Sequence, residues 1–345
     1  MSLLERELRE QPAALARLFE RQSAHASELG AMLRRDDVHY LLIASRGSSS
    51  NAARYAQYLL GRASRVPVAF ATPSLYTLYE QPPRLDGALV IGISQSGESP
   101  DVKAVVEEAR RQGRPTIALT NVAGSPLAYA AEAVLPLEAG EEQSVAATKT
   151  YLNSLGAIAL LFTASTQDPD ARSELERMPA LVEQQLEQSL RDTLELERYG
   201  EIEGGTVVGR GISYGSAFEI ALKIRELSGL LVEAWSAADL MHGPVAAIAQ
   251  GWPVIAVAPS GPALDSMTTA VHGIVARGAR LLAISDDGSL LAAAETPLRL
   301  VSGAPEWLSP LLTVLPGQLV ALRLAGLRGG DVDRPHGLEK ITLTR

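Results

Sequence analysis

An internal repeat constrains the fold of this chain more than any other feature of its sequence. The segment VIGISQSGESPDVKAVVEEARRQGRPTIALT begins at Val90, and VIAVAPSGPALDSMTTAVHGIVARGARLLAIS begins at Val254. Both read as a strand, a Ser-Gly turn, a helix, a glycine and a second strand. Earlier in each half, residues 46–50 (RGSSS) match residues 210–214 (RGISY). Agreement in pattern and spacing predicts two copies of one α/β fold.

Strand-like apolar runs alternate with amphipathic helical segments in both halves. The runs are VHYLLIAS, VPVAFA, ALVIGIS, PTIALT and AVLPLEA in the first half, and GTVVGRG, PVIAVAPS, ARLLAISD and LRLVS in the second. Such alternation predicts a parallel sheet flanked by helices in each half, in a flavodoxin-like three-layer sandwich. We expect a helical lead-in over residues 1–36, domains over 37–168 and 203–330, a helical connector over 169–202 and a tail over 331–345.

The composition excludes several classes of function. The net charge of −9 argues against a nucleic-acid partner, because phosphate backbones are bound through clustered Lys and Arg. The absence of cysteine rules out disulfides, thiolate metal sites and cysteine nucleophiles. The first residues (MSLLERELREQP) do not resemble a signal peptide, and no apolar run approaches the ~18 residues of a membrane helix. We therefore expect a cytoplasmic protein without a membrane partner.

The two repeats differ at the turn that follows the strand. Residues 94–99 read SQSGES, whereas residues 258–263 read APSGPA. A strand-to-helix turn with glycine lets backbone N–H groups and the helix dipole converge on an anion, and serine hydroxyls add neutral donors. Gly47, Ser48 and Ser49 follow the first strand of the same half and could close over the same ligand. The sequence predicts a phosphate monoester site in the first copy, with no metal or cofactor.

Helix capping is the competing interpretation of these serines, since Ser is a preferred N-cap residue. Capping would explain a single serine. Two serine-rich turns at the carboxyl ends of strands in one half, lost in the other half, favour a ligand site, because open α/β sheets bind ligands at that end.

A narrow charged stripe marks the helix predicted over FEIALKIREL. Glu219, Lys223 and Glu226 are spaced i, i+4, i+7, which places them within a stripe about 80° wide. Apart from Arg225, the rest of the circumference is apolar. A polar pocket on a buried helix would have this pattern. The alternative is an ordinary surface Glu–Lys pair, worth only about 0.5 kcal/mol.

Lysine usage draws attention to particular positions. Only Lys103, Lys149, Lys223 and Lys340 occur among 31 basic residues. Unlike Arg, Lys can lose its proton and form a Schiff base with a carbonyl. Lys103 has the position of a generic surface charge, whereas Lys340 lies in a polar tail where packing does not require it.

His242 precedes Gly-Pro in the sequence DLMHGP, which predicts an accessible position at a turn. An imidazole there could move protons near neutral pH. No second His or Cys is nearby, so we expect no metal site.

Several motifs together resemble one known family. They are SQSGES, VAATKT, ALKIRELS, LMHGP and the closing DVDRPHGLEKITL, in family order from about residue 38 onward. The chain resembles the sugar isomerase (SIS) domain family, in particular the isomerase half of glucosamine-6-phosphate synthase and the isomerising sugar-phosphate deaminases. The fold implied is two tandem SIS domains.

The resemblance implies a role for each matching residue. Phosphate binding is implied for Ser49, Ser94, Gln95, Ser96 and Ser99. The sugar site would be bordered by Val145 and Ala147. Glu142 is a further candidate for substrate binding, and a larger, basic pocket beside Glu142 and Val145 would favour a glycated amino acid as part of the substrate. Glu226 would shuttle a proton between C1 and C2, supported by Lys223 and Glu219. His242 would assist ring opening from the neighbouring subunit of a homodimer, and Lys340 would reach the substrate carbonyl.

Four functions remain open on this basis. The leading hypothesis is conversion of glucosamine 6-phosphate to fructose 6-phosphate and ammonia by enediol(amine) proton transfer. The alternatives are an isomerase component supplied with ammonia by a separate glutaminase, a fructosamine-phosphate deglycase, and a sugar-phosphate-sensing protein without catalysis. Without cysteine we expect no glutamine hydrolysis by a cysteine nucleophile. Met241 and Glu339 depart from the residues that the synthase resemblance implies, lysine and a small residue respectively.

Overall fold

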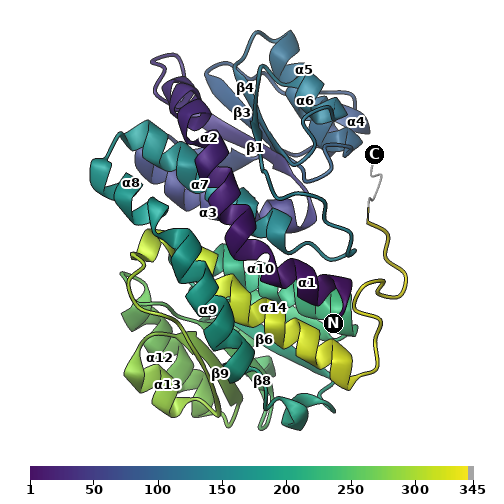
Figure 1. Ribbon diagram of the computed structural model, residues 1–345, viewed down its shortest axis with the longest axis vertical. Coiled ribbons are helices and arrows are strands. Elements are labelled where there is room, and N and C mark those ends of the chain that lie inside the picture. The colour runs from purple at the N-terminus through teal and green to yellow at the C-terminus, as the bar shows by residue number, and fades with distance from the viewer. Residues whose placement is uncertain (341–345) are drawn as a thin grey trace. The chain divides into compact units, whose positions relative to one another are not determined.

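Each half of the chain forms a five-stranded parallel sheet with helices packed against it (Figure 1). The computed structural model describes residues 1–340. These residues fall into two units. The amino-terminal unit consists of Glu10–Glu142, Ala147–Glu176 and residues 339–340. The carboxy-terminal unit consists of Met1–Arg9, Gln143–Ala146 and Arg177–Leu338.

The sheet of the amino-terminal unit has the strand order β2-β1-β3-β4-β5. Its strands are β1 (Tyr40–Ser45), β2 (Val68–Phe70), β3 (Ala88–Ile93), β4 (Thr116–Thr120) and β5 (Ala133–Pro136). The apolar runs of the sequence form β1, β3 and β4, which are buried almost throughout. Strands covered on both faces have this continuous apolar pattern.

Two groups of helices cover this sheet. One group is α2 (Gln11–Leu33), α3 (Gly47–Ser64) and α7 (Lys149–Thr166), which pack on one another. The other group is α4 (Ser74–Thr77), α5 (Pro100–Arg111) and α6 (Pro126–Ala130). The helix α8 (Pro169–Glu176) follows α7. The three layers bring the carboxyl ends of β1 and β3 together at the edge where their loops lead into α3 and α5.

The sheet of the carboxy-terminal unit has the order β10-β9-β8-β6-β7. Its strands are β6 (Gly204–Gly209), β7 (Leu231–Ser236), β8 (Pro253–Val257), β9 (Arg280–Ser285) and β10 (Thr296–Arg299). Alternate residues of the strands face opposite cores: Val207 packs with the α10 and α14 side, whereas Val208 packs with the α12 side. This alternation follows from the two-residue period of a strand.

The helices of this unit also form two groups. One group contains α1 (Leu3–Arg9), α9 (Met178–Asp192), α10 (Tyr214–Ser228) and α14 (Pro310–Leu327). The other contains α11 (Ala237–Met241), α12 (Leu264–Val275) and α13 (Gly288–Ala293). Short 3-10 segments lie at Glu197–Tyr199, Gly211–Ser213, Pro244–Ala247 and Glu306–Leu308.

The predicted repeat is confirmed by the topology. Numbered within each unit from its first strand, both sheets have the order 2-1-3-4-5 and are parallel throughout. The lead-in and the tail are divided between the units: α1 and residues up to Leu338 belong to the carboxy-terminal unit, whereas α2 and residues 339–340 belong to the amino-terminal one.

The expectation that no apolar run reaches membrane length is wrong for one segment. Within the described residues, α14 is long and apolar enough to cross a membrane by length and composition, yet most of it is buried inside its unit. A Cβ on Gly317 would lie 2.2 Å from Ile220 Cγ1, so α14 and α10 pack closely. The apolar character of α14 is therefore explained by its place in the core.

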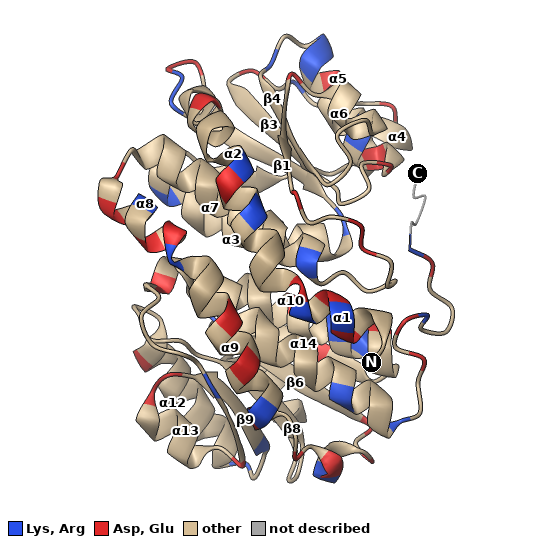
Figure 2. Ribbon diagram, in the orientation of Figure 1, with Lys and Arg blue, Asp and Glu red and all other residues tan. Residues whose placement is uncertain are grey.

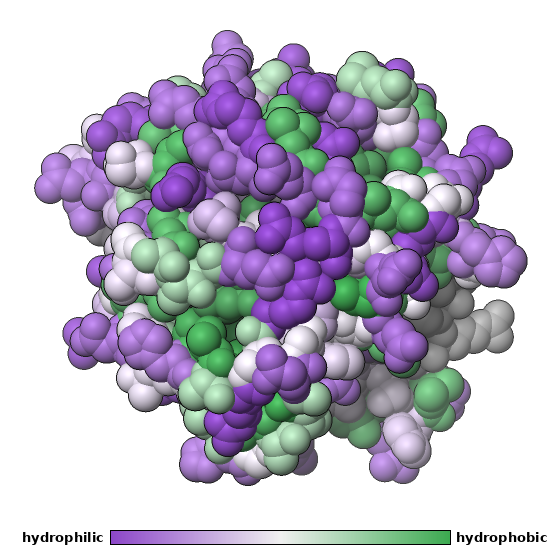
Figure 3. Space-filling model, turned by 90° about the horizontal axis from the view of Figure 1, so that it is seen from below, coloured by the Kyte–Doolittle hydropathy of each residue, from purple (hydrophilic) through white to green (hydrophobic). Residues whose placement is uncertain are grey.

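Charges of both signs are interspersed along the helices, as α1 and α9 show (Figure 2). Several of them form pairs within one helix, for example Arg9 with Glu5 at 2.9 Å. The face seen in Figure 3 is mostly hydrophilic, with hydrophobic residues scattered over it.

Candidate active site

The predicted phosphate site lies at the carboxyl ends of two neighbouring strands of the amino-terminal unit, β1 and β3. Residues 94–99 connect β3 to α5, and residues 46–48 lead from β1 into α3. The chain runs outward in opposite directions from β1 and β3, since β2 lies beyond one and β4 beyond the other. Ligands of open α/β sheets bind at this switch point.

The hydroxyls of the serine turn bond within the turn. Ser94 Oγ accepts a hydrogen bond from Gly97 N–H at 3.1 Å and lies 3.2 Å from Ser99 Oγ. Ser96 Oγ accepts from Glu98 N–H at 3.2 Å. Ser99 occupies the N-cap position of α5, but within the described residues its side chain makes no capping hydrogen bond. Capping of α5 therefore does not account for these serines. The N–H groups of its first turn have protein partners, since Val102 N–H donates to Asp101 Oδ1 at 2.8 Å and Lys103 N–H donates to Ser99 C=O at 3.1 Å. The serine hydroxyls are thus the candidate donors to an anion at this turn.

Gly97 gives the turn its shape. Its φ of +69° is in the left-handed region, and an added Cβ would lie 2.0 Å from Ser125 Oγ. The turn is held from the neighbouring loop, because Gln95 C=O accepts from Asn121 N–H at 3.1 Å and Gly97 C=O accepts from Leu127 N–H at 3.0 Å. Only glycine fits here without displacement.

An ion pair joins the starts of α3 and α5. Arg46 Nε donates to Asp101 Oδ2 at 2.5 Å, and the Asp101 side chain is buried while Arg46 is half exposed. Arg46 immediately precedes α3, and Asp101 lies in the first turn of α5. The pair fixes the first turn of α3, which contains Gly47, Ser48 and Ser49, relative to the serine turn.

In the corresponding turn of the carboxy-terminal unit, a side-chain carboxylate accepts a backbone hydrogen bond. Ser260 N–H donates to Asp286 Oδ1 at 2.7 Å, and Ala258 and Ala263 replace two of the serines. In the repeat alignment Asp286 corresponds to Asn121, a neutral residue. A carboxylate within the protein thus bonds to a backbone donor of this turn, which disfavours a phosphate there.

The charged stripe of α10 is buried. Lys223 is 1% exposed, and its Nζ lies 3.5 Å from Glu219 Oε1 and in hydrogen-bond contact with Glu226 Oε2. Glu219 is fully buried, whereas the side chain of Glu226 is 25% exposed. Burial excludes the surface-pair interpretation. Lys223 holds both carboxylates, and Glu226 is the member of the three that solvent can reach.

A second lysine–carboxylate pair lies in the amino-terminal unit. Lys340 Nζ donates to Glu142 Oε2 at 3.0 Å. Burial raises the pKa of Glu142, but the Lys340 ammonium and hydrogen bonds from Thr150 and Thr148 outweigh it and hold the pKa below its ordinary value. Glu142 is therefore ionised beside the Lys340 ammonium at neutral pH.

The remaining lysines also contact carboxylates. Lys103 forms an exposed pair with Glu107 at 3.1 Å, which agrees with a generic surface role. Lys149, at the start of α7, is buried and lies 2.5 Å from Glu10.

His242 ends α11 and is exposed, as its place before Gly-Pro predicts. Its backbone N–H donates to Asp239 C=O at 3.1 Å. Val145 and Ala147 are half-buried on the segment before α7. Val145 N–H donates to Asp333 C=O at 3.3 Å within the carboxy-terminal unit.

Two carboxylates near this segment were not predicted. Glu7 is buried on α1 and accepts from Gln143 N–H at 2.5 Å and from the Ser144 hydroxyl. Asp333 accepts from the N–H groups of Leu3 and Leu4 at 2.9 and 2.8 Å, at the start of α1. Both pairings join residues over a hundred positions apart, and nothing in the local sequence signals them.

The candidate residues fall in both units. The amino-terminal unit carries Gly47, Ser48, Ser49, Ser94, Gln95, Ser96, Ser99, Glu142, Ala147 and Lys340. The carboxy-terminal unit carries Val145, Glu219, Lys223, Glu226 and His242. Among residues 1–340, no group of three or more His, Cys, Asp or Glu is arranged to hold a metal ion.

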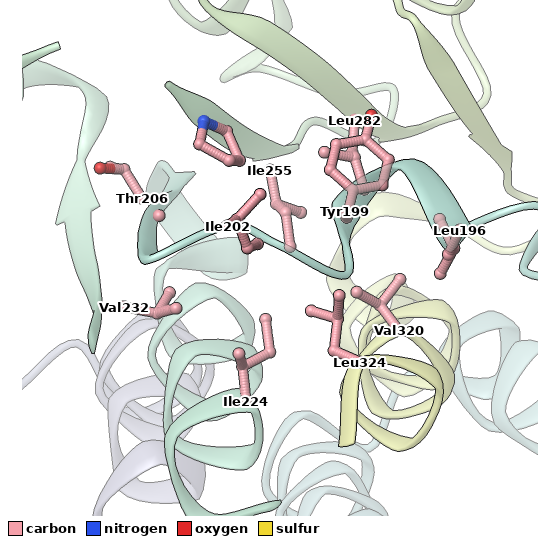
Figure 4. Close-up of a pocket in the computed structure, with 12 residues that line it drawn as sticks. Leu196, Tyr199, Ile202, Thr206, Ile224, Val232, Ile255, Leu282, Val320 and Leu324 are labelled. Carbon is pink, nitrogen blue, oxygen red and sulfur yellow. The ribbon is translucent and has the colours of Figure 1, made fainter. Parts of the chain in front are cut away.

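A separate apolar cavity lies in the carboxy-terminal unit between its sheet and helices α10 and α14 (Figure 4). Ile224, Ile255 and Leu324 point into it, and its polar lining side chains are Thr206 and Tyr199. A phosphosugar needs charged or multiple polar partners, so this cavity does not suit one.

Two tandem α/β units that match one and the same family define a duplicated-domain protein. The SIS domain model matches residues 32–164 and 206–328, once in each unit, and the chain belongs to the SIS domain family. The predicted family and fold class are thereby confirmed.

Relatives of known sequence or structure cover nearly all of the chain. It is 33% identical, over 97% of its length, to the isomerizing glutamine–fructose-6-phosphate aminotransferase of Thermus thermophilus. It covers 58% of that protein and spans about half the length of the curated relatives it matches.

Solved structures extend the comparison. A protein of Silicibacter pomeroyi assigned as a phosphosugar isomerase has a TM-score of 0.86 and 31% identity, with 96% of this chain and 99% of that one covered. Glucosamine-6-phosphate deaminase of Thermotoga maritima has a TM-score of 0.82 at 21% identity, covering 99% and 100%. The latter likeness concerns the fold alone.

Proposed function

We propose that this chain is a phosphosugar isomerase that converts glucosamine 6-phosphate and water to fructose 6-phosphate and ammonia. The observation that carries the proposal is the stripe of α10, in which buried Lys223 holds Glu226 and leaves that carboxylate accessible. A carboxylate fixed by an ammonium and open on one side can take up and return a proton.

The serine turn would bind the phosphate. The hydroxyls of Ser94, Ser96 and Ser99 supply donors without positive side chains. Ser49 would add a donor from the first turn of α3, next to the ion pair between Arg46 and Asp101. A phosphate bound in this way keeps the sugar in one orientation during proton transfer.

Proton transfer would interconvert the two sugars. Glu226 takes the proton from C2 of the open-chain aldehyde, and O1 gains a proton as the enolamine forms. Glu226 then returns the proton to C1, and the C2 amine loses one of its own protons as it becomes an imine. Water adds to the imine, and ammonia leaves as the ketone forms. His242 would assist ring opening from a second subunit of a homodimer, and the Lys340 amine would reach the carbonyl carbon.

An amino-sugar substrate is supported by the relatives, since glutamine–fructose-6-phosphate aminotransferases are named for joining nitrogen to fructose 6-phosphate. The same names favour a second candidate, in which the chain runs in the opposite direction on fructose 6-phosphate and free ammonia.

Purified protein incubated with glucosamine 6-phosphate tests the proposal, with ammonia and fructose 6-phosphate both measured. We expect the two products in equal amounts and deuterium at C1 when the reaction runs in D2O. Glu226→Gln should abolish turnover, whereas Glu203→Gln, an exposed position in the same unit, should not. No ammonia at saturating substrate would exclude the deaminase. Formation of glucosamine 6-phosphate from fructose 6-phosphate and an ammonium salt, with little reverse reaction, would favour the second candidate.

A further inference from the structure

We propose that Glu142 is a positioning residue, which holds the Lys340 amine for reaction and makes no contact with the substrate. The part that concerns the reaction of Lys340 rests on the proposed function. The part that concerns Glu142 rests on its hydrogen bonds and burial. It differs from the expectation that Glu142 binds the substrate.

Glu142 is enclosed on all sides. Its side chain has no exposed surface. Oε1 accepts from Thr148 N–H at 2.8 Å and Thr150 N–H at 3.1 Å. Oε2 accepts from the Thr150 hydroxyl at 2.6 Å and from Lys340 Nζ at 3.0 Å. Both oxygens thus accept hydrogen bonds from the protein, and neither is exposed to solvent.

The two carboxylate oxygens of Glu142 bind different parts of the chain. Oε1 faces the backbone donors at the start of α7, where a carboxylate satisfies N–H groups that lack helical partners. Oε2 is in contact with Lys340, which is 198 positions away in the sequence. Helix capping alone would require only the first oxygen. The second oxygen ties the tail of the chain to α7.

Lys340 differs from its partner in exposure. Its side chain is 25% exposed, whereas the side chain of the carboxylate that holds it has no exposed surface. A buried carboxylate that lost its cation would be destabilised, which favours the docked tail over a released one. Since Lys carries a point charge on a flexible stem, a fixed acceptor is what sets the direction of its amine.

If Glu142 acts through Lys340, its removal should lower kcat and leave phosphate binding intact. Glu142→Gln keeps an oxygen for the N–H groups of Thr148 and Thr150 while it removes the charge. Glu141→Gln is the matched control, because Glu141 is the exposed neighbour.

Lysine acylation measured by mass spectrometry tests the contact without any activity assay. The chain has four lysines, so each can be followed separately. In Glu142→Gln we expect acylation of Lys340 to be at least threefold faster than in the wild type. Acylation of Lys103 and Lys149 should stay unchanged, and Glu141→Gln should match the wild type at all four. Unchanged acylation of Lys340 in Glu142→Gln would overturn the proposal.

Kinetics on glucosamine 6-phosphate test the positioning role. Glu142→Gln should lower kcat at least tenfold with KM within twofold of the wild type. In a Lys340→Met background Glu142→Gln should have no further effect on kcat, because the amine that Glu142 positions is absent. An equal loss in both backgrounds, or a rise in KM alone, would assign Glu142 to the substrate or to general structure. If the wild type itself does not turn over, the proposed function fails, whereas the acylation result still decides the contact.

Discussion

Ser94 Oγ and Ser99 Oγ lie 3.2 Å apart across the turn between β3 and α5, and neither hydroxyl caps the helix. The repeat-equivalent positions hold Ala258 and Ala263, and that turn also connects a strand to a helix, although Gly261 has a φ of +146° where Gly97 has +69°. A strand-to-helix turn can therefore form without the two hydroxyls, and we propose that the first copy retains them for ligand binding.

Replacement of both serines by alanine should weaken substrate binding without unfolding the protein. Two lost hydrogen bonds of about 0.5–1.5 kcal/mol each correspond to a roughly 5- to 100-fold rise in KM. The free energy of unfolding should change by about 1 kcal/mol or less, because the repeat tolerates alanine at both positions. Steady-state kinetics and urea unfolding of Ser94→Ala/Ser99→Ala measure both.

The chain provides a control for this experiment. Ser260 is the equivalent of Ser96 in the other copy, where its N–H is bonded to Asp286. Ser260→Ala should leave KM unchanged, whereas Ser96→Ala should raise it. A KM that responds equally to both substitutions would contradict a single phosphate site in the amino-terminal unit.

Gly97→Ala should lower the free energy of unfolding more than a substitution in a surface turn usually does. The new Cβ would lie 2.0 Å from Ser125 Oγ, and φ of +69° disfavours an L-residue. The left-handed backbone costs about 1–2 kcal/mol and the overpacking about 1–3 kcal/mol. Gly113 has nearly the same φ, +70°, but open space around it. Gly113→Ala should therefore lose only the stability that corresponds to the left-handed backbone. Urea unfolding of the two variants measures both contributions. An equal loss of unfolding free energy in Gly97→Ala and Gly113→Ala would show that the clash with Ser125 is relieved without cost.

The fold was predictable from the sequence because its signals are local or repeated. Apolar runs give the strands, and the match between the segments at Val90 and Val254 predicts that both halves share one topology. The stripe on α10 was also predictable, since helical geometry alone places Glu219, Lys223 and Glu226 on one side. One apolar helix, α14, was missed as a membrane-length segment because Gly317 and Pro316 interrupt its apolar run without ending the helix.

The partners of Glu7 and Glu142 could not be predicted. Each carboxylate bonds to a segment far away in the chain, Glu7 to residues 143–144 and Glu142 to Lys340. In the sequence Glu7 looks like a helix-surface residue and Glu142 like part of an acidic loop. Only tertiary packing determines which acidic residue becomes buried and which donor it binds.

Lys223→Met should destabilise the carboxy-terminal unit and abolish activity. It removes the ammonium that lies 3.5 Å from Glu219, which is fully buried. Loss of one partner from a buried ion pair costs about 3–5 kcal/mol. Lys223→Met/Glu219→Gln should recover part of that loss, because the remaining charge is also removed. Urea unfolding of the single and double variants measures the effect, and a single variant within about 1 kcal/mol of the wild type would contradict it.

The contribution of Glu142 to stability should disappear in acid. Its pKa in the folded protein is below the ordinary value of 4.5, chiefly because the Lys340 ammonium and the Thr150 hydroxyl offset the effect of burial. The unfolded chain then binds more protons in this range, so the stabilisation is complete above pH 4.5 and falls as the pH drops through the folded pKa. The difference in unfolding free energy between the wild type and Glu142→Gln should be constant from pH 7 to 5 and shrink below 4.5. Denaturant unfolding across this pH range, with Glu141→Gln as the control, measures it. A difference that stays constant down to the lowest pH at which the wild type folds would mean that the charge of Glu142 contributes nothing to stability.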